Sequence, residues 1–150
     1  MPVYFYSPRK QPFGCFSNFS AHGFEIDGVY YKTCEHYFQA MKFINSPTDM
    51  EDVRQASTPK RAAFIGRDRK RPLRPDWEEV KDDVMRRGVL RKFQTHAEIR
   101  EILLATGDEE IVEDSSIDYY WGIGADGTGR NMLGEILVET RAILRANEEQ

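Results

Sequence analysis

Residues 33–43 read TCEHYFQAMKF, and within this stretch the periodicity of the sequence changes. The aromatic residues before it are interrupted by Pro and Gly, whereas from Thr33 onward apolar residues recur with helical spacing. Threonine is one of the residue types that cap helix N-termini. The sequence therefore predicts a helix that begins after Thr33 and ends near 45–47, where Asn-Ser-Pro stops it.

Short strands are predicted on the N-terminal side of this helix. The residues at 3–6 (VYFY) are β-branched or aromatic, which favours a strand, and residues 7–18 are expected to form a loop. Two further runs, at 24–26 and 29–31, are separated by Asp27-Gly28, a pair that favours a type I′ turn. We therefore expect a β-hairpin there.

Four more helices are predicted on the C-terminal side, each from a capping pattern or from apolar residues at helical spacing. Their expected positions are Thr58 to Gly66, Asp76 to Phe93, Thr95 to Gly107, and from Asn131 onward. The apolar side chains expected to face the core are Trp77, Val80, Val84, Met85, Ile99, Ile102, Leu103, Leu133, Ile136, Leu137, Ile143 and Leu144. A short strand is also expected at 111–113.

These elements predict an α+β fold that is mainly helical, with a small β component near the N-terminus. Strands and helices do not alternate as βαβ units require, so a doubly wound α/β fold is excluded. A chain of 150 residues suits one compact domain, and we expect that domain to span 1–150.

The composition excludes several classes of protein. Apolar residues make up 40% and charged residues 31%, which is too apolar for a disordered chain and too polar for a membrane protein. No apolar run is long enough for a membrane span, and no signal peptide is evident. We therefore expect a cytoplasmic protein with reduced cysteines and no membrane contact. The net charge of −4 excludes a generally basic surface for nucleic acid, but not a local basic patch.

No metal and no cofactor is predicted. The two cysteines and three histidines have none of the spacings of known metal-binding motifs. Gly122, Gly124 and Gly127 spell GxGxxG, but the dinucleotide-binding motif lies between a strand and a helix of a βαβ unit. One helix and no second strand are expected after these glycines, so we reject that interpretation.

Three segments place polar residues among aromatic ones and are candidates for a site. In the first, at 14–19, Phe16 offers an aromatic face for a base, while Ser17 and Asn18 offer polar groups for a sugar or a base edge. A turn packed under the core is an equally good interpretation of this segment.

The second segment is the helix after Thr33. Glu35 falls in its first turn, where the helix dipole favours an ionised carboxylate. Helical spacing puts Gln39 and Lys42 on the same face as Glu35. On a solvated face they would form an ordinary polar stripe, whereas in a pocket they would combine an acid/base pair with a hydrogen-bonding amide.

The third segment, at 118–131, combines four glycines with Trp121 and leads into a helix N-terminus, which suits close approach of a phosphate. A glycine-rich turn is the plainer interpretation. The charges are also uneven, because residues 60–74 are rich in Lys and Arg and residues 108–118 in Asp and Glu. The basic run either attracts phosphates or is a solvated surface. Lys81 lies near the apolar face of its helix, as a snorkelling or a buried lysine.

Several separated motifs together resemble the YbiA-like family, also called NADAR. They are FSNF at 16–19, EHYFQAMKF at 35–43, RPDW at 74–77 with Lys81 and Met85, LATG at 104–107, YWG at 120–122 through Asp126-Gly127, and NMLG at 131–134. They cover almost the whole chain in the family's order, which makes the resemblance far more specific than any one motif. It implies a compact, mainly helical fold and N-glycosidase chemistry.

The resemblance implies two substrate classes. The preferred one is ADP-ribosylated guanine, in DNA, RNA or a nucleotide, from which the enzyme removes the ADP-ribosyl group. Such a reversal of ADP-ribosylation serves DNA repair, and it implies a DNA ADP-ribosyltransferase as functional partner. The alternative class is the ribosylamino-pyrimidine phosphates of early riboflavin synthesis. A module that binds ADP-ribose without cleaving it is the third interpretation.

Cleavage of a glycosidic C–N bond builds positive charge on the ribose, which a nearby carboxylate stabilises. Glu35 is the best carboxylate by position, and Lys42 or Lys81 would neutralise a phosphate or attack the anomeric carbon as an amine. The candidate catalytic residues are Glu35, Lys42, Asp118 and Lys81. The candidate substrate-binding residues are Phe16, Ser17, Asn18, Tyr37, Gln39, Trp77, Trp121, Gly122, Asp126 and Asn131.

Overall fold

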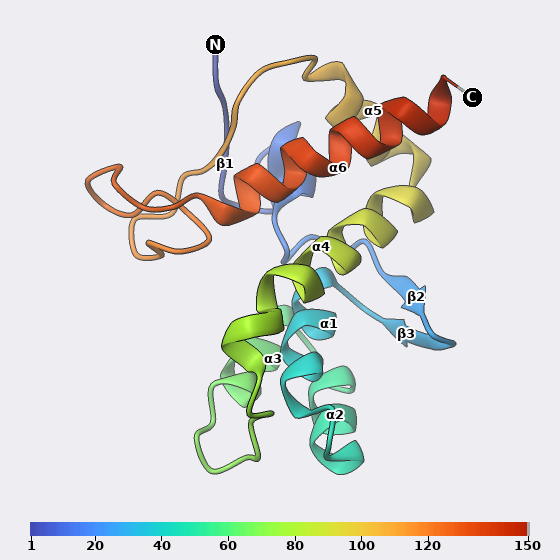
Figure 1. Cartoon of the computed structure of the whole chain (residues 1–150), viewed down its shortest axis with the longest axis vertical. Helices are drawn as coiled ribbons and strands as arrows, with labels where there is room; N and C mark the ends of the chain where they lie inside the picture. The colour runs from blue at the N-terminus through green and yellow to red at the C-terminus, as the bar shows by residue number, and fades with distance from the viewer. Residues whose placement is uncertain (150) are drawn as a thin grey trace. The chain divides into compact units, whose positions relative to one another are not determined.

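The structure is a computed structural model that describes residues 1–149, and helices predominate among them, as the sequence predicts (Figure 1). The α-helices are α1 (Cys34–Ala40), α2 (Pro47–Arg54), α3 (Pro59–Gly66), α4 (Trp77–Thr95), α5 (Ala97–Ala105) and α6 (Met132–Glu148). The 3₁₀ helices are η1 (Phe13–Phe16) and η2 (Met41–Phe43). The strands are β1 (Val3–Phe5), β2 (Phe24–Ile26), β3 (Val29–Tyr31) and β4 (Ile111–Glu113). The mainly helical α+β class is confirmed.

Contacts within the chain define two compact units. Unit 1 comprises Met1–Ser20 and Phe93–Gln150, and unit 2 comprises Ala21–Lys92. Both ends of the chain therefore belong to the same unit, and α4 begins in unit 2 and ends in unit 1. One domain over 1–150 stays a prediction. Across residues 1–149, no helix has the length and apolar character needed to cross a membrane.

Unit 1 contains a parallel strand pair that the sequence does not reveal. β1 pairs with β4, with Val3 opposite Ile111 and Phe5 opposite Glu113. The side chain of Asn131, just before α6, binds β4 at both ends of its amide. Nδ2 donates to the Ile111 carbonyl at 2.9 Å, and Oδ1 accepts from the Glu113 backbone N–H at 2.9 Å. The backbone of Asn131 has φ 53°, a left-handed conformation that Asn tolerates better than most residues.

The close approach of α6 to β4 in unit 1 depends on Gly134. A Cβ at this position would lie 2.1 Å from the Ile111 carbonyl oxygen and 2.4 Å from Nδ2 of Asn131. The apolar side chains of this region that are fully buried are Ile111, Leu133, Ile136 and Leu137. The spacing of Asn131 and Gly134 thus sets how the last helix meets the strand.

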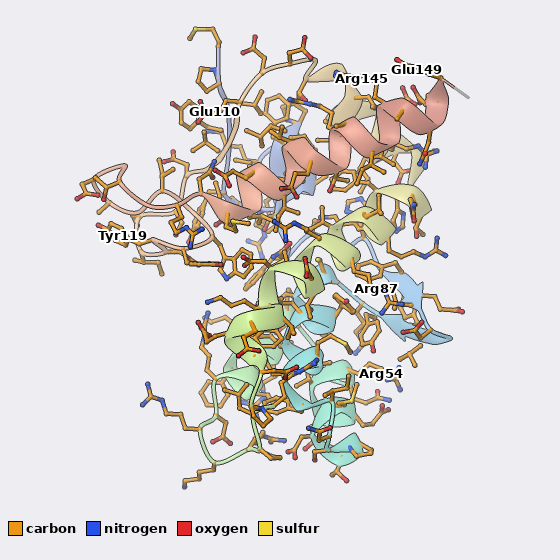
Figure 2. The ribbon with its side chains drawn as sticks, in the orientation of Figure 1. Arg54, Arg87, Glu110, Tyr119, Arg145 and Glu149 are labelled. Atoms are coloured by element: carbon orange, nitrogen blue, oxygen red, sulfur yellow. The ribbon has the colours of Figure 1, made fainter. Side chains whose placement is uncertain are left out.

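Unit 2 contains the predicted hairpin and the first three helices. Asp27 and Gly28 have φ values of 53° and 80°, as a type I′ turn requires, and β2 pairs antiparallel with β3. Arg87 of α4 lies beside this hairpin, where its Nη2 donates to Oδ1 of Asp27 at 2.8 Å (Figure 2). Every residue of α1 is buried, and α1 packs against α2 and α3.

The aromatic core of unit 2 surrounds the ring of Tyr37 in α1. Tyr31 and Phe24 contact this ring edge-on, with centroids 5.3 and 5.8 Å away. Gly88 of α4 leaves room for the ring, since a Cβ there would lie 2.6 Å from its Cδ2 atom. Burial raises the pKa of the Tyr37 hydroxyl, so the ring stays neutral.

The capping residues predicted for α1 and α3 are confirmed. Oγ1 of Thr33 accepts from the backbone N–H of His36 at 3.1 Å, and Oγ1 of Thr58 accepts from that of Arg61 at 3.0 Å. Each hydroxyl thus satisfies one of the N–H groups that a helix leaves unpaired at its start.

One helix was not expected. The predicted first helix ends early, at Ala40, and continues as η2, and α2 then begins at Pro47. Oγ of Ser46 donates to Oδ2 of Asp49 at 2.5 Å at the start of this helix. Proline suits the first turn of a helix because its missing N–H would be unpaired there in any case. The prediction that Pro47 only stops a helix was therefore wrong.

Two capping patterns and one core position also differ from prediction. Thr95 does not cap α5, because it is the last residue of α4, and His96 precedes α5 without a side-chain capping bond. The carboxylate of Asp76 lies before α4 but binds Nε of Arg74, at 2.7 Å. Ile143 is 45% exposed and so is not a core residue, because it lies on the solvent side of α6.

Asn131→Ala is predicted to lower the free energy of unfolding by about 2–6 kcal/mol, because two backbone groups of β4 lose their partner at about 1–3 kcal/mol each. Urea titration followed by circular dichroism measures the change. Asn147→Ala, at an exposed position of α6, is the matched control and should stay within about 0.5 kcal/mol of wild type. Equal stability of N131A and wild type would contradict the role given to this amide.

Candidate active site

Helix α1 places Glu35 and Gln39 on one face, as their spacing predicts. Nε2 of Gln39 donates to Oε2 of Glu35 at 2.8 Å, and the two residues are only 4% and 7% exposed, respectively. Glu35 lies in the first turn of α1, where the helix dipole stabilises a negative charge. The carboxylate is therefore both shielded from water and fixed in position.

The amide of Gln39 is confined by α3. A Cβ on Gly66 would lie 2.0 Å from Oε1 and 2.6 Å from Cδ of Gln39. Oε1 is buried and accepts no hydrogen bond from the described residues. The orientation of the amide follows from its partner, because only the NH₂ group can donate to the Glu35 carboxylate. Glycine at 66 thus lets α3 approach α1 closely enough to hold the amide against the carboxylate.

Lys42 follows α1 in η2, and its ammonium lies at the end of α3. Nζ donates to the Gly66 carbonyl at 3.2 Å and lies 5.9 Å from the centroid of the Trp77 ring. Burial lowers the pKa of Lys42, the negative charge of Glu35 raises it, and the positive charge of Arg67 lowers it. The structure therefore brings Glu35, Gln39 and Lys42 together, as the sequence predicts.

Trp77, the first residue of α4, packs against the same helix face. Its ring centroid lies 5.0 Å from that of Phe38, with the planes tilted by 59°. Trp77 is 6% exposed, so the protein itself covers most of the ring. Contact of Trp77 with a substrate remains a prediction.

Lys81 lies one turn further along α4. Its Nζ donates to Oε1 of Glu78 at 2.7 Å, and its side chain is 16% exposed, against 79% for Glu78. The stem is thus covered while the ammonium reaches an exposed acid, as in a snorkelling lysine. The charge of Lys81 also contributes to lowering the pKa of Lys42, so it acts on the same site.

Two of the candidate substrate-binding residues, both aromatic, are core residues of their units. Tyr37 in unit 2 and Phe16 in unit 1 are each 1% exposed. The ring centroid of Phe16 lies within 6.0 Å of those of Phe5, Phe13 and Phe93. Neither ring has an open face for a base, so the plainer interpretation, a core aromatic residue, fits both.

Ser17 and Asn18 follow η1 in unit 1. Oγ of Ser17 accepts from the backbone N–H of Phe19 at 3.1 Å, which closes a local turn. Ser17 is buried and Asn18 is half-buried. Contact of either residue with a substrate remains a prediction.

Asp118 shapes the loop that it begins. Its Oδ1 accepts from the backbone N–H groups of Tyr120 and Trp121, at 2.9 and 2.8 Å. The Trp121 ring is half-buried and meets that of Tyr120 edge-on, with centroids 4.8 Å apart. Gly122 is buried against β4, where a Cβ would lie 2.9 Å from the Glu113 carbonyl oxygen. Loop geometry alone explains these contacts, and the catalytic role of Asp118 stays a prediction.

Asp126 and Asn131 also have partners within unit 1. Oδ1 of Asp126 accepts from the backbone N–H and the hydroxyl of Thr128, at 3.1 and 2.7 Å. These hydrogen bonds lower the pKa of the exposed Asp126 carboxyl. The amide of Asn131 binds β4, as described above. Both side chains thus already form hydrogen bonds within unit 1, and a contact with substrate would have to coexist with these bonds.

Acidic neighbours partly neutralise the basic run at 60–74. Arg71 pairs with two aspartates of α2 at 2.8 Å each, and Arg74 pairs with Asp76 at 2.7 Å. The run is therefore not one continuous phosphate-attracting surface. Arg67 is the member of the run whose charge acts on Lys42.

Within residues 1–149, no group of three or more His, Cys, Asp or Glu side chains could hold a metal ion. The buried His36 has protein partners at both ring nitrogens, the Thr33 hydroxyl at 2.8 Å and the Ala56 carbonyl at 2.9 Å. Burial lowers the pKa of His36. That the reaction needs neither metal nor cofactor stays a prediction.

The groups gathered on α1, η2 and α3 suit chemistry at a sugar carbon. A buried carboxylate stabilises a developing cation or takes a proton from water. A lysine with a lowered pKa neutralises an anion while protonated and is a nucleophile when neutral. The arrangement thus places a negative and a positive side chain close together in unit 2.

Comparisons with known proteins identify the family of this chain. Residues 4–145 match the NADAR domain. The chain belongs to the NADAR family. It is 50% identical over 147 residues to the N-glycosidase Npun_R5314 of Nostoc punctiforme, which covers 97% of this chain and 94% of that protein. It is 47% identical over 139 residues to the N-glycosidase YbiA of Escherichia coli, which covers 93% of this chain and 86% of that protein.

The NMR structure of the E. coli protein YbiA has the same fold, with a TM-score of 0.92 and 44% identity over 100% of this chain and 88% of that chain. The family predicted from the motifs is confirmed, and so is the enzyme class: this NADAR protein is an N-glycosidase. A more distant relative, at 38% identity over 144 residues, is the riboflavin biosynthesis protein VVA0006 of Vibrio vulnificus. The match covers 96% of this chain and 39% of that protein.

Sequence reasoning missed two contributors to the Glu35 site. Gly66 was identified only as the end of a helix, yet its Cα hydrogens face the Gln39 amide and its carbonyl binds Lys42. Arg67 was counted only within the basic run. A helix-ending glycine followed by arginine carries no signal that it will meet another helix, because that contact depends on how α1 and α3 pack.

Gln39→Ala and Gly66→Ala should each reduce kcat by about 10²-fold, because the carboxylate of Glu35 loses its anchor and small misplacements are costly in catalysis. Steady-state kinetics on the glycosidase substrate measure the change, with KM much less affected. Gln55→Ala is the matched control, since Gln55 makes the same i, i+4 bond to Glu51, at 2.8 Å, on an exposed surface. Full kcat in both folded variants would exclude a positioning role.

Proposed function

We propose that this N-glycosidase hydrolyses the bond between ribose and base in ADP-ribosylated guanine, in nucleic acid or in a nucleotide. The observation that carries the proposal is the buried Glu35 carboxylate, held by Gln39 where its charge acts on Lys42. The reaction would reverse ADP-ribosylation and so repair modified DNA. A DNA ADP-ribosyltransferase as partner and a cytoplasmic location belong to the same proposal.

The chemistry asks for a carboxylate at the anomeric carbon. As the C–N bond breaks, its electron pair leaves with the base and the ribose gains oxocarbenium character. Glu35 stabilises that charge and accepts a proton from the attacking water. The water oxygen bonds to the anomeric carbon, and the base nitrogen takes up one proton. The products are ADP-ribose and unmodified guanine.

We assign the neighbouring cations to the phosphates of the substrate. The diphosphate of ADP-ribose is an anion, and charge-assisted bonds to phosphate are stronger than neutral ones. Lys42 is close enough to Arg67 and Lys81 for both charges to lower its pKa. The lowered pKa also favours the free amine, so attack of Lys42 on the anomeric carbon is the alternative route.

Two of the other predicted residues, Asn18 and Trp121 of unit 1, enter the proposal as substrate contacts. Asn18 and Trp121 are half-buried, which leaves part of each side chain accessible. Asp118 is retained as a second catalytic carboxylate and Asp126 as a substrate contact, although the structure shows both of them bonded to their own loop.

The ribosylamino-pyrimidine phosphates of riboflavin synthesis are the second candidate substrates. The observation that favours them is the 38% identity to a relative named for riboflavin biosynthesis. Their cleavage needs the same oxocarbenium stabilisation, with one phosphate in place of a diphosphate. The Glu35 site fits either class, so the substrates themselves must be compared.

The proposal predicts that the wild-type protein releases ADP-ribose from an oligonucleotide that carries ADP-ribosyl guanine. Mass spectrometry follows the loss of the ADP-ribosyl mass, and a parallel reaction contains the ribosylamino-pyrimidine 5-phosphate. We expect kcat/KM to be higher for the modified oligonucleotide. An unmodified oligonucleotide and heat-denatured protein serve as controls.

Two outcomes would count against the preferred substrate. Release of ribose 5-phosphate from the pyrimidine alone would assign the protein to riboflavin intermediates. Binding of ADP-ribose without cleavage of either substrate would make it a binding module. A thermal shift with ADP-ribose detects the second case, since a ligand at a hundred times its Kd stabilises a protein by about 2.7 kcal/mol.

A further inference from the structure

Unit 1 contains a groove that includes none of the predicted site residues. Its volume is about 320 Å³, which lies within the range of small-molecule sites. The residues that line it are Tyr4, Phe5, Tyr6, Ser7, Lys10, Gln11, Phe13 and Asp114. They come from β1, from the loop that follows it and from the end of β4, which are adjacent in unit 1 (Figure 1).

Two tyrosines of the extended N-terminal segment form the aromatic wall. Tyr4 lies in β1 and Tyr6 directly follows the strand, and both residues line the groove. They are 54% and 57% exposed, whereas Phe5 between them is 4% exposed and packs into the core. Adjacent exposed aromatic rings in a groove are typical of a surface that a ligand covers.

The spacing of these rings suits bases that are not stacked on each other. Residues two apart in a strand are about 6.6 Å apart, roughly twice the 3.4 Å rise of stacked nucleotides in a duplex. Each ring can therefore take one base of an unpaired strand. Stacking on an aromatic side chain tolerates any base, because every base has a π face. A duplex hides these faces and does not fit.

The polar groups of the groove complement a nucleotide. Lys10 offers an ammonium for a backbone phosphate, and Asp114 offers a carboxylate that can accept from the amino group of a base. Among the residues that the structure describes, neither side chain takes part in an ion pair. Both charges are thus available to a ligand.

The loop that carries Lys10 is already ordered. The backbone N–H of Lys10 donates to the Ser7 carbonyl at 3.2 Å, and the Gly14 N–H donates to the Lys10 carbonyl at 2.8 Å. Gly14 lies so close to Pro8 that a Cβ would be 2.5 Å from the proline carbonyl oxygen. A preformed groove loses little conformational entropy when a ligand binds.

We propose that this groove binds single-stranded nucleic acid, with bases on Tyr4 and Tyr6 and a phosphate on Lys10. The inference deepens the proposed function and rests on it in one respect: it places the modified guanine within a strand rather than in a free nucleotide. Strand binding itself requires no glycosidase reaction, so it can be tested separately.

The test is the affinity of the whole chain for a short, labelled, unmodified oligothymidylate, measured by fluorescence anisotropy. Tyr4→Ala and Tyr6→Ala should each weaken binding about tenfold or more. Tyr4→Phe and Tyr6→Phe keep the rings and should bind as wild type does. Tyr30→Ala is the matched control, because Tyr30 is also 54% exposed but lies on β3 in unit 2.

Lys10→Ala adds an electrostatic readout. Its plot of log affinity against log salt should be shallower than that of wild type by about 0.7, the value for one phosphate contact on a single strand. No binding of the oligonucleotide by wild type at low salt, or equal affinities of wild type and the two alanine variants, would overturn the proposal. The proposal would also be overturned if mononucleotides displaced the labelled oligonucleotide as well as an unlabelled oligonucleotide does.

The outcome separates this proposal from the proposed function. Cleavage of a free ADP-ribosylated guanosine without strand binding would support the proposed glycosidase reaction and exclude strand binding by the groove. Strand binding that depends on Tyr4 and Tyr6, without cleavage of any ADP-ribosylated guanine, would support strand binding by the groove and exclude the proposed substrate.

Discussion

The hydrogen bond from the Gln39 amide to the Glu35 carboxylate is the interaction on which the candidate site depends. It forms inside a helix that is buried along its whole length, so the carboxylate has little freedom to move. It also requires glycine at 66, because α3 would otherwise occupy the space of the amide. The packing of α1 against α3 thus decides the position of the Glu35 carboxylate, to which we assign the main catalytic role.

Unit 1 uses the same combination of an amide and a glycine. The Asn131 amide binds two backbone groups of β4, and Gly134, one turn later, lets α6 approach the strand. In unit 1 the amide joins two elements, whereas in unit 2 it holds a carboxylate of its own helix, and in both units a glycine removes a Cβ that would collide with the amide. An amide suits both roles because it forms hydrogen bonds without carrying a charge that burial would penalise. The family motif at 131–134 is therefore explained by structure before any contact with substrate is invoked.

Short sequence patterns predicted several features that short-range interactions determine. The caps at Thr33 and Thr58, the turn at 27–28 and the shared face of Glu35 and Gln39 all follow from short-range rules. The pairing of β1 with β4 and the contact of Gly66 with Gln39 could not be predicted, because they join segments far apart in the sequence. The environment of aromatic residues could not be predicted either, because the sequence does not show whether Phe16 and Tyr37 face a substrate or the core. The family was predicted correctly because its motifs, taken together, are more specific than the interpretation of any one residue.

The most direct test of the account is the single-turnover rate of Glu35→Gln with an oligonucleotide that carries ADP-ribosyl guanine, measured together with the Kd for that substrate. Glutamine keeps the shape of the side chain and removes its charge, so binding should change little. We expect a rate about 10²–10⁴-fold below that of wild type, with Kd within about threefold, since the charge acts mainly in the transition state. A rate close to that of wild type would contradict the assignment of Glu35 as the catalytic carboxylate.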